Sequence, residues 1–157
     1  MKTFKLFITF FFTAVFVLSL NSCSKDNEGL GPFNKVADAG KFRDYIILGG
    51  DDVQILDFRS AAEFRAGHIP GAKNFEATVQ NTESNDTDFC KAILNNFDKN
   101  RPLYMYGGNN AILQDVVPGR ISKIGFEKLN KYILMGGFDA WKIAASGDDS
   151  FKIETGL

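Results

Sequence analysis

The segment from Val53 to Glu76 constrains the fold most, because it encodes a strand, a helix and a second strand in close succession. Its first residues, 53–58, form an apolar run that is typical of a buried strand. Ser60 and Glu63 then have the spacing of a capping box, which starts a short helix, and Gly67 is positioned to end that helix. The segment therefore predicts a strand followed at once by a helix.

A second strand follows the helix closely, and similar short strands recur later in the chain. Pro70-Gly71 predicts a tight turn into a strand near residues 72–75. Further short apolar runs at 102–106 and 131–134 are separated from it by longer amphipathic stretches. Strands that alternate with helices indicate a parallel sheet covered by helices, the α/β class.

Apolar residues at helical spacing predict the covering helices. One stripe ends at Gly49-Gly50, a second runs from Phe89 to Phe97, and a terminal helix follows Gly136-Gly137. We expect the helical stretch after residue 111 to be broken at Pro118-Gly119. The first stripe consists of Ala39, Phe42, Tyr45 and Ile46, and the second of Phe89, Ile93, Leu94 and Phe97. Together these elements predict a single domain over residues 35–150, with a central parallel sheet of about five strands.

Residues 1–22 have the composition of a targeting segment. Two lysines precede an apolar run from Leu6 to Leu20, which is shorter than the roughly 20 residues that span a bilayer. The run ends at Leu20-Asn21-Ser22-Cys23, which resembles the lipobox of bacterial lipoproteins, where the cysteine is lipidated. We interpret 1–22 as a lipoprotein signal peptide, Cys23 as the lipidation site and 23–34 as a tether. A plain secretory signal with an incidental cysteine is the alternative.

Lipidation would anchor the protein to a membrane without a spanning helix. The expected location is the bacterial cell envelope, facing the periplasm or the exterior. Removal of residues 1–22 takes away two lysines and no acidic residue, so the remaining chain is mildly acidic and offers no nucleic-acid surface. With Cys23 acylated, Cys90 is the only thiol left, and no intramolecular disulfide can form.

Three motifs follow one another along the chain. The second is a strand that ends at Tyr106 and leads into a glycine-rich loop, and the third is Gly136-Gly137-x-x-x-Trp141. The first motif consists of Asp57, Arg59, Glu63, Gly67, His68, Pro70, Gly71 and Ala72. In this order the three motifs resemble those of the rhodanese (sulfurtransferase) family over residues 35–145, and the first matches the family position by position. The resemblance implies a rhodanese-like α/β domain.

The resemblance also implies where catalysis would take place. In the family, a cysteine after the Tyr-ended strand accepts and transfers a sulfane sulfur, and loop amides with a helix N-terminus lower its pKa. Here Gly107 stands at that position, and Gly108, Asn109, Asn110 and Ala111 complete the loop. Glycine carries no nucleophile, so no catalytic residue is predicted. The loop amides could still form a nest that binds an anion.

Other candidate residues have structural interpretations. The main role expected for Arg59 is structural, and the alternative is that it faces the pocket. Asp57, Glu63, His68, Pro70 and Gly71 are expected to hold the motif together. His68 is the only histidine of the chain, so no cluster of histidines can bind a metal. We expect His68 to be a hydrogen-bonded residue of the turn. Cys90 is expected to pack on a helix, since nothing near it in the sequence would lower its pKa. No metal or cofactor is predicted.

These features favour a membrane-tethered domain that binds a small anion or an envelope protein partner at the former catalytic loop. Two rival functions remain. The first is sulfur transfer from thiosulfate or a persulfide through a non-standard thiol such as Cys90. The second is a purely structural envelope lipoprotein. The missing nucleophile at Gly107 argues against an enzyme.

Overall fold

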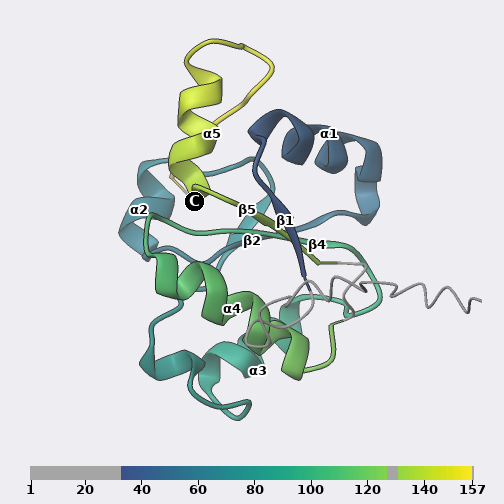
Figure 1. Cartoon of the computed structure of the whole chain (residues 1–157), viewed down its shortest axis with the longest axis vertical. Helices are drawn as coiled ribbons and strands as arrows, with labels where there is room; N and C mark the ends of the chain where they lie inside the picture. Colours follow the sequence, from purple (N-terminus) through teal and green to yellow (C-terminus); the bar gives the residue numbers. More distant parts are fainter. Residues whose placement is uncertain (1–32, 127–130, 157) are drawn as a thin grey trace, which may run out of the picture.

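A computed structural model describes residues 33–126 and 131–156, which form one α/β domain (Figure 1). Its centre is a parallel sheet of five strands in the order β1-β5-β4-β2-β3. The strands are β1 (Asn34–Val36), β2 (Gln54–Asp57), β3 (Ala72–Asn74), β4 (Leu103–Tyr106) and β5 (Lys131–Leu134). The predicted fold class is confirmed.

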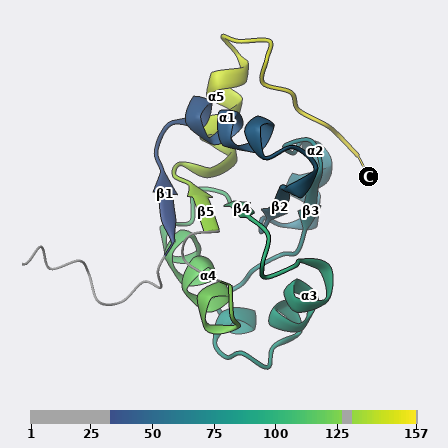
Figure 2. The same ribbon diagram turned by 90° about the vertical axis from the view of Figure 1, so that its right-hand side faces the viewer.

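Helices cover both faces of the sheet (Figure 2). Helices α1 and α5 lie on one face and α3 and α4 on the other, while α2 connects β2 to β3. The helices are α1 (Ala39–Gly49), α2 (Ala61–Ala66), α3 (Asp88–Asn96), α4 (Ala111–Lys123) and α5 (Gly137–Ala145), with 3-10 turns at Gly50–Asp52 and Gln80–Thr82. This layered arrangement explains why the residues of β2, β4 and β5 are almost all buried.

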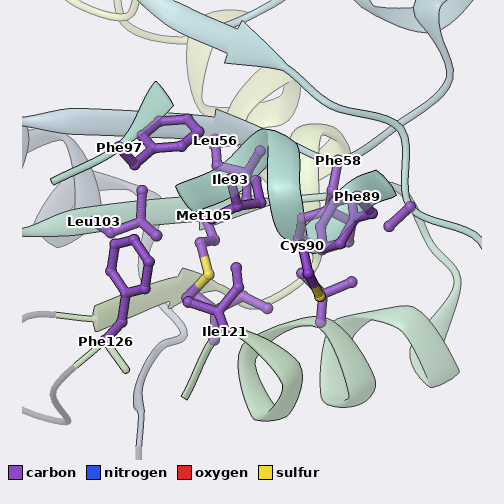
Figure 3. Close-up of a cluster of buried hydrophobic side chains, with 13 residues drawn as sticks. Leu56, Phe58, Phe89, Cys90, Ile93, Phe97, Leu103, Met105, Ile121 and Phe126 are labelled. Carbon is purple, nitrogen blue, oxygen red and sulfur yellow. The ribbon is translucent and has the colours of Figure 1, made fainter. Parts of the chain in front are cut away.

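Each face of the sheet has its own hydrophobic core. On the α3/α4 face, Leu56, Leu103 and Met105 from the strands pack with Ile93 and Ile121 from the helices (Figure 3). On the opposite face, the core joins strand residues to the aromatic side chains of α1 and α5, namely Phe42, Phe138 and Trp141. Burial of this apolar surface is the main driving force for folding, since the described cysteine is free.

The helix after residue 111 differs from the sequence prediction. Pro118 lies inside α4, which continues without a break to Lys123. Its neighbours Val117 and Ile121 are fully buried in the core. Their burial stabilises the helix more than the loss of one backbone hydrogen bond at proline weakens it.

The helix stripes predicted from the sequence are correct only in part. Phe89, Ile93 and Phe97 are buried, but Leu94 is 41% exposed and Cys90 is buried in its place. Tyr45 of the first stripe is likewise half exposed on α1.

The ends of the domain reach slightly beyond the predicted limits of 35–150. Strand β1 begins at Asn34, and the C-terminal segment continues to pack after residue 150. Phe151 makes an edge contact with Trp141, and Glu154 forms a two-hydrogen-bond backbone bridge with His68. The C-terminal segment therefore holds the end of α2 against α5.

The predicted signal peptide, Cys23 and most of the tether lie outside the described residues. Among residues 33–126 and 131–156, no helix has both the length and the apolar character needed to cross a bilayer.

Candidate functional site

The candidate site is a cleft of about 410 Å³ at the carboxyl edge of the sheet. This edge is where parallel α/β sheets bind ligands, because the loops after adjacent strands diverge there. Arg59 follows β2, the loop at Gly108 follows β4, and α5 follows β5. The cleft is lined by Arg59, Glu63, Ala66, Gly67, Gly108, Asn109, Phe138, Asp139 and Lys142.

Arg59 forms a buried ion pair with Asp57 at the base of the cleft. Its Nε lies 3.1 Å from both carboxylate oxygens, and its Nη2 donates to Asp57 and, at 2.7 Å, to the carbonyl of Gly67. Burial alone would lower the pKa of Arg59, but the hydrogen bonds and charge of Asp57 raise it overall. This pair ties the end of β2 to the end of α2, so the structural role predicted for Arg59 agrees with the geometry.

Aromatic rings enclose the Arg59 guanidinium. Its Cζ lies 4.0 Å from the ring centroid of Phe138 and 5.4 Å from that of Tyr106. Both distances fit cation–π contacts. The Tyr106 hydroxyl accepts a hydrogen bond from the Ile69 amide, and burial raises the pKa of that hydroxyl above its ordinary value. The guanidinium is thus held in one orientation by its neighbours.

Glu63 forms the predicted capping box at the start of α2. Its Oε2 accepts hydrogen bonds from the Ser60 amide at 3.1 Å and the Ser60 hydroxyl at 2.6 Å, and the Ser60 hydroxyl accepts from the Glu63 amide. The other carboxylate oxygen faces the loop, since a Cβ added to Gly108 would lie 3.6 Å from Oε1. Glu63 therefore caps a helix with one oxygen and borders the cleft with the other.

Helix α5 supplies the opposite wall. Lys142 and Asp139 form an ion pair of 2.6 Å one helical turn apart, and the Asn109 amide group also donates to Asp139. The pKa of Asp139 lies below its ordinary value, chiefly because of the hydrogen bond from Lys142. These contacts join the loop after β4 to the first turns of α5.

Gly107 packs against the aromatic ring of Phe58. A Cβ placed on Gly107 would lie 2.5 Å from Phe58 Cζ and 2.8 Å from Cδ2, which is closer than carbon atoms approach in proteins. Phe58 is 2% exposed and belongs to the core of the α3/α4 face. The ring thus fills the space that a side chain at position 107 would need.

The loop from Gly107 to Ala111 has no residue with positive φ. A backbone nest alternates right- and left-handed conformations, so this loop lacks the usual geometry of one. In addition, the Asn110 side chain caps α4 by accepting from the amides of Ile112 and Leu113. These two first-turn amides are therefore already occupied, which leaves the amides of Gly108 and Asn109 at the cleft.

Gly137 allows α5 to approach this loop. Its φ is +57°, and a Cβ there would lie 2.9 Å from the carbonyl carbon of Gly107. The next amide, that of Phe138, donates to the Gly107 carbonyl at 2.8 Å. Glycine at position 137 is required both by this conformation and by the close contact.

His68 is the hydrogen-bonded turn residue that the sequence predicts. Its Nδ1 lies 3.0 Å from the Phe64 carbonyl, and its ring stacks on the Phe64 ring with centroids 3.8 Å apart. Pro70 and Gly71 follow in the turn before β3, with Gly71 at a φ of +77°. None of the three lines the cleft, and no group of three or more His, Cys, Asp or Glu suited to a metal occurs in the described part of the chain.

Cys90 is fully buried on α3 and does not line the cleft. Figure 3 shows it among the apolar side chains of the α3/α4 core, beside Phe89. Its Sγ donates a weak hydrogen bond to the Ser84 carbonyl at 3.4 Å. This environment matches the packing role predicted for it.

The structure brings together three of the six predicted binding residues. Arg59, Gly108 and Asn109 line the cleft, whereas Gly107 faces Phe58, and Asn110 and Ala111 begin α4. Sequence reasoning missed Phe138, Asp139 and Lys142. The Gly136-Gly137 pair was the available signal, since it turns the chain from β5 into a helix beside the loop.

Comparisons with known proteins agree with this architecture. The family model described as the rhodanese-like domain matches residues 44–144. No curated protein sequence matches significantly.

Several solved structures are similar. The crystal structure of the Alr3790 protein from Anabaena sp. shares 26% identity with a TM-score of 0.58, over 77% of this chain and 93% of that one. The solution structure of the rhodanese-like domain from the same Anabaena protein shares 25% identity with a TM-score of 0.57, over 80% of each chain. A Rhodopseudomonas palustris protein of unknown function, described as a possible tyrosine phosphatase, shares 20% identity with a TM-score of 0.53, over 77% of this chain and 85% of that one.

Proposed function

Because the chain belongs to the rhodanese-like domain family, we propose that it is a member without sulfur-transfer chemistry, and that it binds a small ligand or a protein partner at the cleft. Gly107 takes the position of the family's nucleophilic cysteine at the end of β4. Sulfur transfer requires a thiolate that attacks and then carries the sulfur. Glycine supplies none, so the proposed function is non-covalent binding.

The observation that carries this proposal is the packing of Phe58 against Gly107. The ring occupies the space that a side chain at position 107 would need, so this position is filled rather than open. Cys90, the cysteine of the described residues, is fully buried and lies outside the cleft. A thiol that is fully buried has no access to substrate.

The cleft itself retains the means to bind. Arg59 lines it with a guanidinium fixed by Asp57, and the amides of Gly108 and Asn109 have no hydrogen-bond partner among the residues that the structure describes. Fixed donors lose little freedom on binding, which favours recognition of an oxygen-bearing group. A small anion or the carboxylate of a protein partner would satisfy these donors.

A protein partner is supported by one further observation. Ile143 on α5 is 74% exposed and borders a shallow hollow next to the cleft, which Asn109 and Asp139 share. Exposed apolar side chains beside a polar cleft are common at protein interfaces. A partner would contact this hollow while a polar group enters the cleft.

The proposed location is a bacterial envelope membrane, with Cys23 lipidated and the domain held at its surface. The support is the sequence of residues 1–23, in which a basic start and a short apolar run precede Leu20-x-x-Cys23. A short polar tether then separates the anchor from β1.

Titration of the ¹⁵N-labelled protein with sulfate, thiosulfate, phosphate and acetate tests binding at the cleft. We expect amide shifts at Gly108 and Asn109 that saturate in the millimolar range. A Gly108→Leu variant, whose side chain would fill the cleft, should lose these shifts while the core amides keep their positions. If no anion and no envelope extract shifts these amide signals, the cleft is not a binding site, and the result favours the alternative of a structural envelope lipoprotein.

A further inference from the structure

The cleft contains a carboxylate that no cation of the described residues balances. Glu63 Oε2 is used in the capping box, but Glu63 has no lysine, arginine or histidine nitrogen within 4.0 Å in the described part of the chain. Asp139, on the opposite wall, is already paired with Lys142. Glu63 Oε1 borders the open space above Gly108 and has no hydrogen-bond partner among the described residues.

The cleft also contains one unused nitrogen of a buried arginine. Arg59 is 7% exposed, and its hydrogen bonds to Asp57 and Gly67 use Nε and Nη2 only. Every fully shielded side-chain nitrogen or oxygen among the described residues has a partner, so the unpaired Nη1 reaches solvent. Since Arg59 lines the cleft, Nη1 is the guanidinium nitrogen that is left to donate to a ligand there.

The side chains of Glu63 and Arg59 both border Gly108, since a Cβ on it would lie 3.6 Å from Glu63 Oε1 and 3.9 Å from Arg59 Cγ. The missing side chain at position 108 leaves the space beside them open. Both residues line the same cleft, so one small molecule in it can contact both.

The balance of charges decides which ligand fits best. Asp57 neutralises Arg59 and Asp139 neutralises Lys142, so Glu63 leaves the cleft with one uncompensated negative charge. The charge of Glu63 weakens the binding of a ligand that is only anionic, and a ligand that is only cationic accepts no hydrogen bond from Arg59 Nη1. A ligand with both charges satisfies both groups.

We propose that the cleft recognises a small zwitterion of the amino-acid type. Its carboxylate accepts a hydrogen bond from Arg59 Nη1, and its cationic group contacts Glu63 Oε1. The ring of Phe138 offers an apolar wall for a short aliphatic part. This inference rests on the proposed function and names the ligand class of the same cleft.

Glycine and its two halves, acetate and methylammonium, provide the test. In titrations of the ¹⁵N-labelled full chain at neutral pH, we expect glycine to shift the Gly108 and Asn109 amides with a Kd about tenfold below that of either half. Each half satisfies only one of the two groups, so neither gains the full interaction.

Glu63→Gln is the decisive variant, because glutamine retains the capping box but removes the charge. It should bring the affinity for glycine down to that for acetate. Glu76→Gln, which removes an exposed carboxylate away from the cleft, is the matched control and should leave the glycine advantage intact. If Glu63→Gln disturbs the fold, Gly108→Leu is the second variant and should abolish binding of all three probes.

The outcomes separate this inference from the proposed function. If glycine and acetate bind with equal affinity, and Glu63→Gln strengthens the binding of both, the zwitterion proposal is wrong and the cleft is an anion site. Equal affinity for glycine and methylammonium would overturn it in favour of a cation site. If none of the three probes shifts the cleft amide signals while sulfate or an envelope protein does, the zwitterion proposal is wrong but the proposed binding function is retained.

Discussion

The ring of Phe58 occupies the space into which a side chain at Gly107 would project. The two residues come from the ends of neighbouring strands, since Phe58 follows β2 and Gly107 follows β4. The packing at this edge of the sheet thus requires glycine at position 107. That relationship links the glycine at position 107 to the stability of the domain.

Gly107→Ala should therefore lower the free energy of unfolding by about 1–3 kcal/mol, because the added methyl group overpacks the space that Phe58 fills. Gly108→Ala is the matched control on the neighbouring residue. A Cβ at position 108 would meet no atom closer than 3.6 Å, and φ there is not positive. The free energy of unfolding of this variant should therefore stay within about 0.5 kcal/mol of the wild-type value. Denaturant unfolding of both variants compares them. Equal stabilities would show that Phe58 moves aside without cost.

Asp57→Asn should destabilise the domain by about 3–5 kcal/mol, because it leaves the Arg59 charge buried without its partner. Asp44→Asn removes one of the two carboxylate partners of Arg43 at the surface, and should cost less than about 1 kcal/mol. Unfolding in urea measures both. A small loss for Asp57→Asn would mean that solvent reaches Arg59 freely.

Lys142→Met should raise the pKa of Asp139 towards its ordinary value, because the hydrogen bond from Lys142 is the main cause of its depression. A carboxyl whose pKa is lowered by folding adds stability above its unfolded pKa of about 3.9, and that stability is lost as the pH falls through the lower folded value. The side-chain carbon shift of Asp139, followed from pH 7 to pH 2, reports this pKa. An unchanged titration in the variant would assign the depression to Asn109 or Arg59 instead.

Local motifs made much of the fold predictable from sequence. The Ser60–Glu63 capping box and the strand at 131–134 occur as expected, because short-range hydrogen bonds and apolar runs determine them. The continuous helix through Pro118 was not predictable in this way. It depends on Val117 and Ile121 being buried against the sheet, which is a tertiary effect.

The candidate site was predictable only where one motif contains it. Arg59 and Gly108 were identified from their own segments, but the walls formed by Phe138 and Lys142 depend on how β5 returns beside β4. The contact between Phe58 and Gly107 joins two strands across the sheet, and no spacing within either segment encodes it. Long-range packing therefore limits what the sequence predicts here.

Replacement of Cys23 by serine should abolish palmitate incorporation in cells and release the protein from the membrane fraction. The reason is that the lipid attached to Cys23 is the proposed anchor. Cys90→Ser is the control and should label as the wild type does. Labelling that persists in Cys23→Ser would exclude lipidation at this residue.

The most direct measurement is a thiosulfate:cyanide sulfurtransferase assay of the purified wild-type protein and its Cys90→Ser variant. A persulfide cannot form at Gly107, and Cys90 is buried, so both proteins should produce no thiocyanate above the uncatalysed background. Thiocyanate production by the wild type that disappears in Cys90→Ser would contradict the proposal and make the domain a sulfurtransferase with a displaced nucleophile.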